Sequence, residues 1–101
     1  MNPTDKKKSK AVAVGYDPRD QAPKVLAAGQ GGLAEKIKTL GLENHIPVLQ
    51  DQDLVDQLID LEVSQEIPES LYEAVAKILA FVYSLDRSPS RHITLDDTAK
   101  R

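Results

Sequence analysis

Ala11-Val12-Ala13-Val14-Gly15-Tyr16 is the stretch that organises the rest of the chain, and Asp17-Pro18 follows it directly. Small and β-branched side chains without any charge are typical of a strand that is buried on both faces. The Asp-Pro pair favours a turn, so this strand should end at about residue 16. We therefore predict that residues 11–16 form the central strand of a sheet.

Length and composition indicate one globular domain. The chain has 101 residues, of which 41% are hydrophobic and 29% charged, which allows a single modest core. No apolar run approaches the roughly 20 residues that cross a bilayer, and none resembles a secretory signal. The chain has no cysteine for disulfides or thiolate metal sites. We expect a cytoplasmic protein.

The polar ends of the chain are predicted to lie outside the folded part. Residues 1–10 carry Lys6-Lys7-Lys8-Ser9-Lys10 and should form a flexible basic arm. Residues 88–101 begin with Ser88-Pro89-Ser90 and scattered charges, which are typical of a disordered tail. The α/β domain should therefore occupy residues 11–87.

Between these ends, strand and helix patterns alternate. Residues 22–28 should form a second strand, joined to the first in an antiparallel hairpin. A helix over residues 33–43 and a short strand over residues 45–49 complete a βαβ-length span, which predicts parallel pairing with a right-handed crossover. A fourth, edge strand is predicted at residues 62–63. The fold class is α/β, with a small mixed four-stranded sheet packed with three to four helices.

Two of the predicted helices have a simple amphipathic pattern. In the helix over residues 33–43, Leu33, Ile37 and Leu40 should face the core, and Gly41 is a candidate stop signal. Asp51 should cap a helix over residues 52–61, whose outer face is acidic.

The last helix, over residues 68–86, is apolar over a wider arc than contact with a sheet requires. On a helical wheel, one narrow sector should face the sheet; it contains Leu71, Val75, Ile78, Val82 and Leu85. A flank roughly 100° away contains Tyr72, Ala76, Leu79 and Tyr83. Either this flank packs against a neighbouring helix or the turn at residues 17–23, or it forms with Ala22 and Pro23 a shallow groove for a partner's hydrophobic anchor.

Catalytic and cofactor chemistry find little support, so we predict a protein that is not an enzyme and uses no cofactor or metal. His45 and His92 are the histidines, and neither has an acid or nucleophile at a recognisable spacing. The stretch Gly29-Gln30-Gly31-Gly32 lacks the arrangements of phosphate-binding loops. The acidic residues between positions 51 and 60 lack the pattern of a calcium loop and fit the solvated face of a helix.

The charge distribution leaves two classes of partner. The net charge is −3, with positive charge at residues 6–10 and an acidic middle, which suits protein partners better than nucleic acid. The alternative is a small α/β nucleic-acid-binding module that uses the lysine arm; such binding would weaken steeply with salt.

From residue 11 to residue 87 the chain resembles the C-terminal cytoplasmic domain of FlhB, the switch protein of the flagellar type III export gate, and its injectisome counterparts of the SctU/YscU family. The resemblance rests on residues 11–17, on Ala22-Pro23-Lys24-Val25-Leu26-Ala27-Ala28-Gly29, on Ile46-Pro47-Val48, on Glu66-Ile67-Pro68-Glu69, on residues 71–76 and on Ile78-Leu79-Ala80. It implies a four-stranded sheet with surrounding helices.

The resemblance also implies that this chain does not cut itself. The family is cleaved at Asn-Pro-Thr-His before the first strand, where the asparagine side chain attacks its own backbone carbonyl. The positions that align with this motif are Lys6, Lys7, Lys8 and Ser9, which supply no such nucleophile. Asn2-Pro3-Thr4-Asp5 keeps part of the motif but lies in the arm, where no fold would hold the turn under strain.

By the same resemblance, the chain corresponds to the already cleaved half of the family's protein, as a standalone domain without its transmembrane helices. The implied function is a protein-binding module of the flagellar or type III export apparatus, with export substrates or export-gate proteins as partners and peripheral association with the membrane apparatus. The family's shallow apolar patch for substrate recognition matches Ala22, Pro23, Ala76 and Leu79. Together with the wheel, this gives a candidate protein-binding patch of Ala22, Pro23, Tyr72, Ala76, Leu79 and Tyr83.

Overall fold

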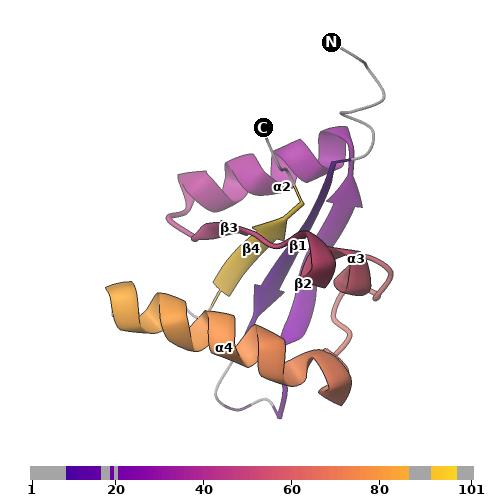
Figure 1. Ribbon diagram of the computed structural model, residues 1–101. Coiled ribbons are helices and arrows are strands. Elements are labelled where there is room, and N and C mark those ends of the chain that lie inside the picture. Colours follow the sequence, from indigo (N-terminus) through magenta and orange to yellow (C-terminus); the bar gives the residue numbers. More distant parts are fainter. Residues whose placement is uncertain (1–8, 17–18, 20, 87–91, 98–101) are drawn as a thin grey trace.

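The computed structural model describes residues 9–16, 19, 21–86 and 92–97. Within these ranges the chain forms a four-stranded sheet with helices on both of its faces (Figure 1). The elements in chain order are β1 (Lys10–Gly15), β2 (Lys24–Gln30), α2 (Gly32–Glu43), β3 (Val48–Gln50), α3 (Gln52–Leu58), α4 (Glu69–Asp86) and β4 (His92–Asp96). The predicted α/β class is confirmed.

β1 lies in the middle of the sheet, as its apolar sequence predicted. The strand order is β2-β1-β4-β3, and β1 pairs antiparallel with both β2 and β4. The predicted hairpin of β1 and β2 is also confirmed. Its register shifts between Ala13, which pairs with Ala27, and Val14, which pairs with Val25. Leu26 is the extra residue at this bulge and is 44% exposed.

The prediction of a disordered tail is wrong for residues 92–96, which form the strand β4. Ile93 and Leu95 are fully buried in the main core, and Thr94 and Asp96 are buried on the opposite face of the sheet. The strand is stable here because it fills the place between β1 and β3 and so has hydrogen-bond partners on both sides. The folded part of the chain therefore extends beyond residue 87.

β4 also changes the predicted strand pairing. β3 pairs parallel with β4, not with β2, so β2 and β3 lie at opposite edges of the sheet. Residues 62–63 form no strand. Instead, the following residues bind the edge of β2: Ser64 donates to the carbonyl of Val25 at 2.7 Å, and the amide of Val25 donates to the carbonyl of Gln65 at 3.0 Å.

The two faces of the sheet carry cores of different size. On one face, side chains from β1, β2 and β4 pack with α3 and α4; this main core includes Val12, Val14, Val25, Leu54, Val55, Leu58, Val75, Val82, Ile93 and Leu95. On the other face, Ala34 and Ile37 of α2 form a second cluster with Ala11 of β1, and Ala13 of β1 and Ala27 of β2 pack against it. Alanine at these strand positions lets the helix approach the sheet closely.

Residues of α2 face the sheet in a different way from the prediction. Ile37 is buried as expected, but Leu33 and Leu40 are 52% and 48% exposed. Gly41 is buried within the helix and does not end it. A Cβ at Gly41 would lie 2.9 Å from Oγ1 of Thr94. The small residue is needed because the helix lies directly over β4 at this point.

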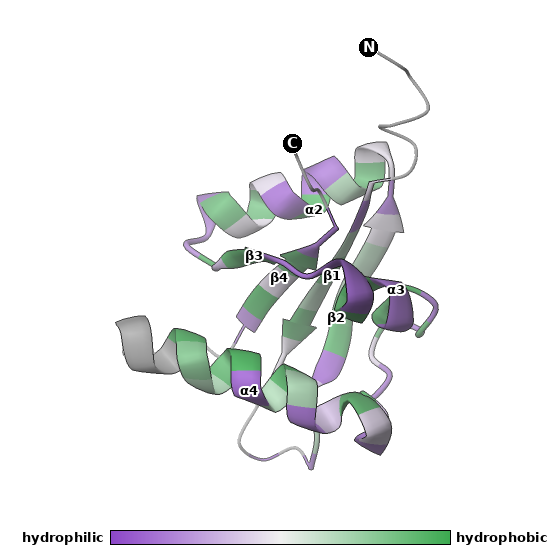
Figure 2. Cartoon of the chain, in the orientation of Figure 1, coloured by the Kyte–Doolittle hydropathy of each residue, from purple (hydrophilic) through white to green (hydrophobic). Residues whose placement is uncertain are grey.

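The remaining helices follow their sequence patterns closely. Asp51 caps α3, with its carboxylate accepting from the amide of Leu54 at 3.1 Å, and α3 ends at Leu58, earlier than predicted. In α4, Val75 and Val82 are buried, and Leu71 and Ile78 pack against the core as expected; the side chain of Leu85 lies outside the described residues. Figure 2 shows apolar residues around much of α4, whereas the visible turns of α3 are mainly polar.

Candidate protein-binding surface

Ala22 and Tyr72, two members of the predicted patch, line one surface recess. Its volume is about 410 Å³. The other lining residues are Gln21, Glu66, Ile67 and Glu69. The recess therefore joins three parts of the chain: the segment just before β2, the segment before α4, and the first turns of α4 itself.

Backbone hydrogen bonds hold these three parts together. The amide of Ile67 donates to the carbonyl of Pro23 at 2.8 Å, and Lys24 forms an isolated antiparallel bridge with Glu66. Ile67 is only 3% exposed and anchors its segment in the main core. The segment is therefore fixed beside Ala22, and the recess does not depend on a free loop.

The other members of the patch have different positions. Pro23 is fully buried, so it offers no surface to a partner. Ala76 and Leu79 follow Tyr72 by four and seven residues and are half-buried, so they extend the same flank of α4. Leu79 also packs against the main core. The side chain of Tyr83 lies outside the described residues.

The rim of this recess is acidic. Glu66 and Glu69 are both exposed, and the lining contains no lysine or arginine among the described residues. Further along α4, Glu73 pairs with Lys77 at 3.4 Å on the outer surface of the helix. The lining is mainly polar, and Ala22 and Tyr72 supply its exposed apolar part. Such a recess can contact a hydrophobic side chain at Ala22 and Tyr72 and attract a neighbouring positive charge to the carboxylates.

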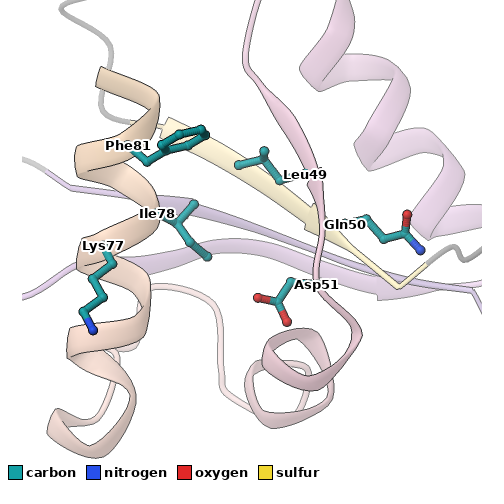
Figure 3. Close-up of a pocket in the computed structure, with 6 residues that line it drawn as sticks. All are labelled: Leu49, Gln50, Asp51, Lys77, Ile78 and Phe81. Atoms are coloured by element: carbon teal, nitrogen blue, oxygen red, sulfur yellow. The ribbon is translucent and has the colours of Figure 1, made fainter. Parts of the chain in front are cut away.

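A second recess lies on the opposite flank of α4, and sequence reasoning missed it. Its volume is about 240 Å³, and it separates α4 from the edge strand β3. Phe81 and Leu49 point toward one another across it, with Ile78 at its base (Figure 3). Phe81 is 57% exposed. The wheel carried the signal, because Phe81 lies on the flank opposite Tyr72.

The remaining sequence candidates do not assemble into a site. His45 and His92 are both exposed; His45 lies in the loop after α2, and His92 is the first residue of β4. Within the described ranges, no group of three histidine, cysteine, aspartate or glutamate residues could hold a metal. His45 has a left-handed backbone with φ of 61°, a conformation that histidine adopts more readily than most residues. Gly31, also left-handed, donates its amide to the carbonyl of Ser9 at 2.8 Å.

The basic arm is described only at its end. Lys6, Lys7 and Lys8, like the upstream Asn-Pro-Thr-Asp stretch, lie outside the described residues. Lys10 belongs to β1, and its ammonium group lies 3.0 Å from the carboxylate of Asp56. This hydrogen bond, with the charge of Asp56, raises the pKa of Lys10 above its ordinary value.

Among the described residues, no helix has both the length and the apolar character that a membrane span requires.

The sequence of this chain is similar to those of several known proteins. The family model described as the FlhB HrpN YscU SpaS Family matches residues 1–82. The "Uncharacterized protein YlqH" of Bacillus subtilis (strain 168) is 44% identical over 80 residues, which are 78% of this chain and 86% of that protein. The flagellar biosynthetic protein FlhB of Yersinia enterocolitica is 48% identical over 79 residues, which are 76% of this chain and 21% of FlhB.

A solved structure agrees with these sequence matches. The crystal structure of the PscU C-terminal domain superposes with a TM-score of 0.68 and 31% sequence identity, covering 72% of this chain and 95% of that domain. The chain thus spans about a fifth of the length of FlhB but nearly all of the PscU domain. The resemblance inferred from the sequence is confirmed: the chain belongs to the FlhB HrpN YscU SpaS family.

Proposed function

We propose that this domain is a non-enzymatic protein-binding module of a flagellar or type III export apparatus. It binds export substrates or export-gate proteins through the surface that Ala22, Tyr72, Ala76 and Leu79 form. The observation that carries the proposal is the recess itself, because Ala22 and Tyr72 line it together in a chain of the FlhB family. Such a recess suits one hydrophobic anchor of a partner chain.

The packing of α4 supports this assignment and limits how it can be tested. Val75 and Val82 hold the helix on the sheet, so Tyr72 and Ala76 are presented from a rigid element. Leu79 contributes to the core as well as to the surface. A charge at Leu79 would therefore disturb the fold, whereas a charge at half-buried Ala76 would change mainly the surface.

A pull-down with matched variants tests the proposal. The wild-type domain is used as bait in cytoplasmic and membrane fractions of a flagellated bacterium that carries it. We expect it to capture identified flagellar or type III export proteins, and Ala76→Asp to lose them. Ala74→Asp makes the same chemical change at an exposed position on the other side of α4 and should retain them.

Two results would contradict the proposal. One is the absence of every export-apparatus protein from the wild-type capture. The other is equal capture by wild type and Ala76→Asp when circular dichroism shows both to be folded.

The nucleic-acid alternative gains no support from the described residues. Lys10, the last lysine of the arm, is paired with Asp56, and the outer face of α3 beside it is acidic. Binding to generic DNA that falls steeply with salt and disappears on deletion of residues 1–9 would restore that alternative.

A further inference from the structure

The acidic rim of the Ala22 and Tyr72 recess indicates which protein segments it accepts. This inference rests on the proposed function, because it concerns the partner of the same surface. Glu66 and Glu69 line the recess together with Ala22, Ile67 and Tyr72. A binding site that combines apolar and acidic lining selects for both properties in its partner.

The local backbone determines where the two carboxylates lie. Ile67 is buried in the core, so its neighbour Glu66, whose backbone pairs with Lys24 at the edge of β2, remains exposed. Glu69 is the first residue of α4, and Tyr72 follows it by three residues on the same side of the helix. Both acids therefore border the place where Ala22 and Tyr72 meet.

Neither Glu66 nor Glu69 takes part in an ion pair found between described residues. The ion pairs found there join other residues: Lys10 with Asp56, Lys38 with Glu35 and Asp96, and Lys77 with Glu73. Glu69 also lies in the first turn of α4, where a negative charge favours the helix dipole. That role explains one acid, but it does not account for Glu66, which precedes the helix.

We propose that the recess binds a protein segment in which an apolar side chain is flanked by lysine or arginine. The apolar side chain would contact Ala22 and Tyr72, and the neighbouring cation would pair with Glu66 or Glu69. The volume of about 410 Å³ lies toward the lower end of the roughly 300–1,000 Å³ typical of binding pockets. It therefore suits one anchor side chain with its flanking residues, not a whole folded surface.

Selection from a phage-displayed library of random short peptides on the immobilised chain tests the proposal. We expect the enriched peptides to carry lysine or arginine next to an apolar residue. In resynthesised peptides, replacement of those cations by glutamine should weaken binding about three- to tenfold at low salt, the range for one or two exposed charge pairs. High salt should reduce the difference between the two peptides. Fluorescence anisotropy measures both effects.

Variants of the domain identify the charges responsible. The double variant Glu66→Gln and Glu69→Gln should bind the basic and the glutamine peptides equally, while Glu73→Gln, outside the recess, should keep the preference. The double variant Glu66→Lys and Glu69→Lys should transfer the preference to peptides with glutamate beside the anchor. A structural role for the two acids would not reverse the charge preference in this way.

The outcomes separate this inference from the proposed function. Enriched apolar peptides without a basic bias, whose binding Ala76→Asp abolishes, would overturn the inference and leave the protein-binding surface in place. Unchanged preference in the double glutamine variant would also overturn it. If no peptide is enriched at all, both the inference and the binding surface fail.

Discussion

Replacement of Leu95 by alanine should strongly destabilise the domain. Leu95 lies on β4, is 0% exposed and belongs to the main core. Truncation of a buried leucine to alanine costs about 2–5 kcal/mol, since both the transfer free energy and a cavity contribute. Because a domain of this size has a total stability of about 5–15 kcal/mol, the variant should lose a large part of it.

Leu42→Ala is the matched control. Leu42 lies in α2 and is 64% exposed, so the same substitution removes little buried area and should change the free energy of unfolding by less than about 0.5 kcal/mol. Urea titration followed by far-UV circular dichroism measures both variants. With a slope of about 1–3 kcal/mol per M urea, Leu95→Ala should lower the midpoint by roughly 1 M or more.

This comparison can refute the structural reasoning about the C-terminal strand. If Leu95→Ala and Leu42→Ala had the same midpoint within error, residue 95 would not be buried, and residues 92–96 would behave as the tail that composition suggested. If Leu95→Ala did not fold at all, Ile93→Val would provide a milder change at another fully buried position of β4, with an expected cost of about 0.5–1.5 kcal/mol.

Three further predictions concern stability, and all use urea titration. Gly41→Ala should destabilise the domain by about 1 kcal/mol, because overpacking against Thr94 exceeds the gain in helix propensity. Gly32→Ala is the control and should be neutral or stabilising, because a Cβ there would lie in open space. Equal effects of the two substitutions would contradict the close approach of α2 to β4. Asp51→Ala should lose the cap of α3 at a cost of about 1 kcal/mol, whereas Asp51→Asn should retain most of it; an equal loss would exclude capping. Burial lowers the pKa of Lys38, but its bonds to neighbouring carboxylates outweigh this effect and raise the pKa above 10.5. The ion pair's contribution to stability is therefore complete below about pH 10.5 and is lost as pH rises further. Wild type should lose more stability in that range than Lys38→Met, and parallel pH profiles of the two proteins would refute the assignment.

Local sequence was sufficient to predict most individual elements. The apolar run at residues 11–16 identified β1, because an uninterrupted apolar run is typical of a strand that is buried on both faces. Asp51 marked the start of α3, because a carboxylate at that position satisfies a free amide of the first turn. Both signals depend on residues close together in the chain and not on the partner strands.

The position of β4 could not be inferred as easily. His92-Ile93-Thr94-Leu95-Asp96 alternates apolar and polar residues as a strand does, but it is short and follows a proline- and serine-containing stretch. The strand is stable only because two other strands flank it. The local sequence does not indicate that residues 92–96 pair with strands this far away in the chain. Because β4 was not predicted, β3 was assigned β2 as its neighbour, which is wrong.

For the binding surface, sequence reasoning predicted which flank of α4 is apolar but not what covers it. Ala22 and Tyr72 meet in one recess as expected, whereas Pro23 is buried because the segment at residues 64–67 binds over the edge of β2. That segment also brings Glu66 to the rim. Its position depends on long-range backbone hydrogen bonds, which a helical wheel does not include.

The most direct test of the proposed surface is site-specific photocrosslinking in living cells. Tyr72 and Phe81 lie on opposite flanks of α4, each lining one recess, and either can be replaced by p-benzoylphenylalanine with little change of shape. We expect flagellar or type III export proteins, identified by mass spectrometry, to crosslink from position 72 and not from position 81. Export proteins captured only from position 81, or from neither position, would contradict the account.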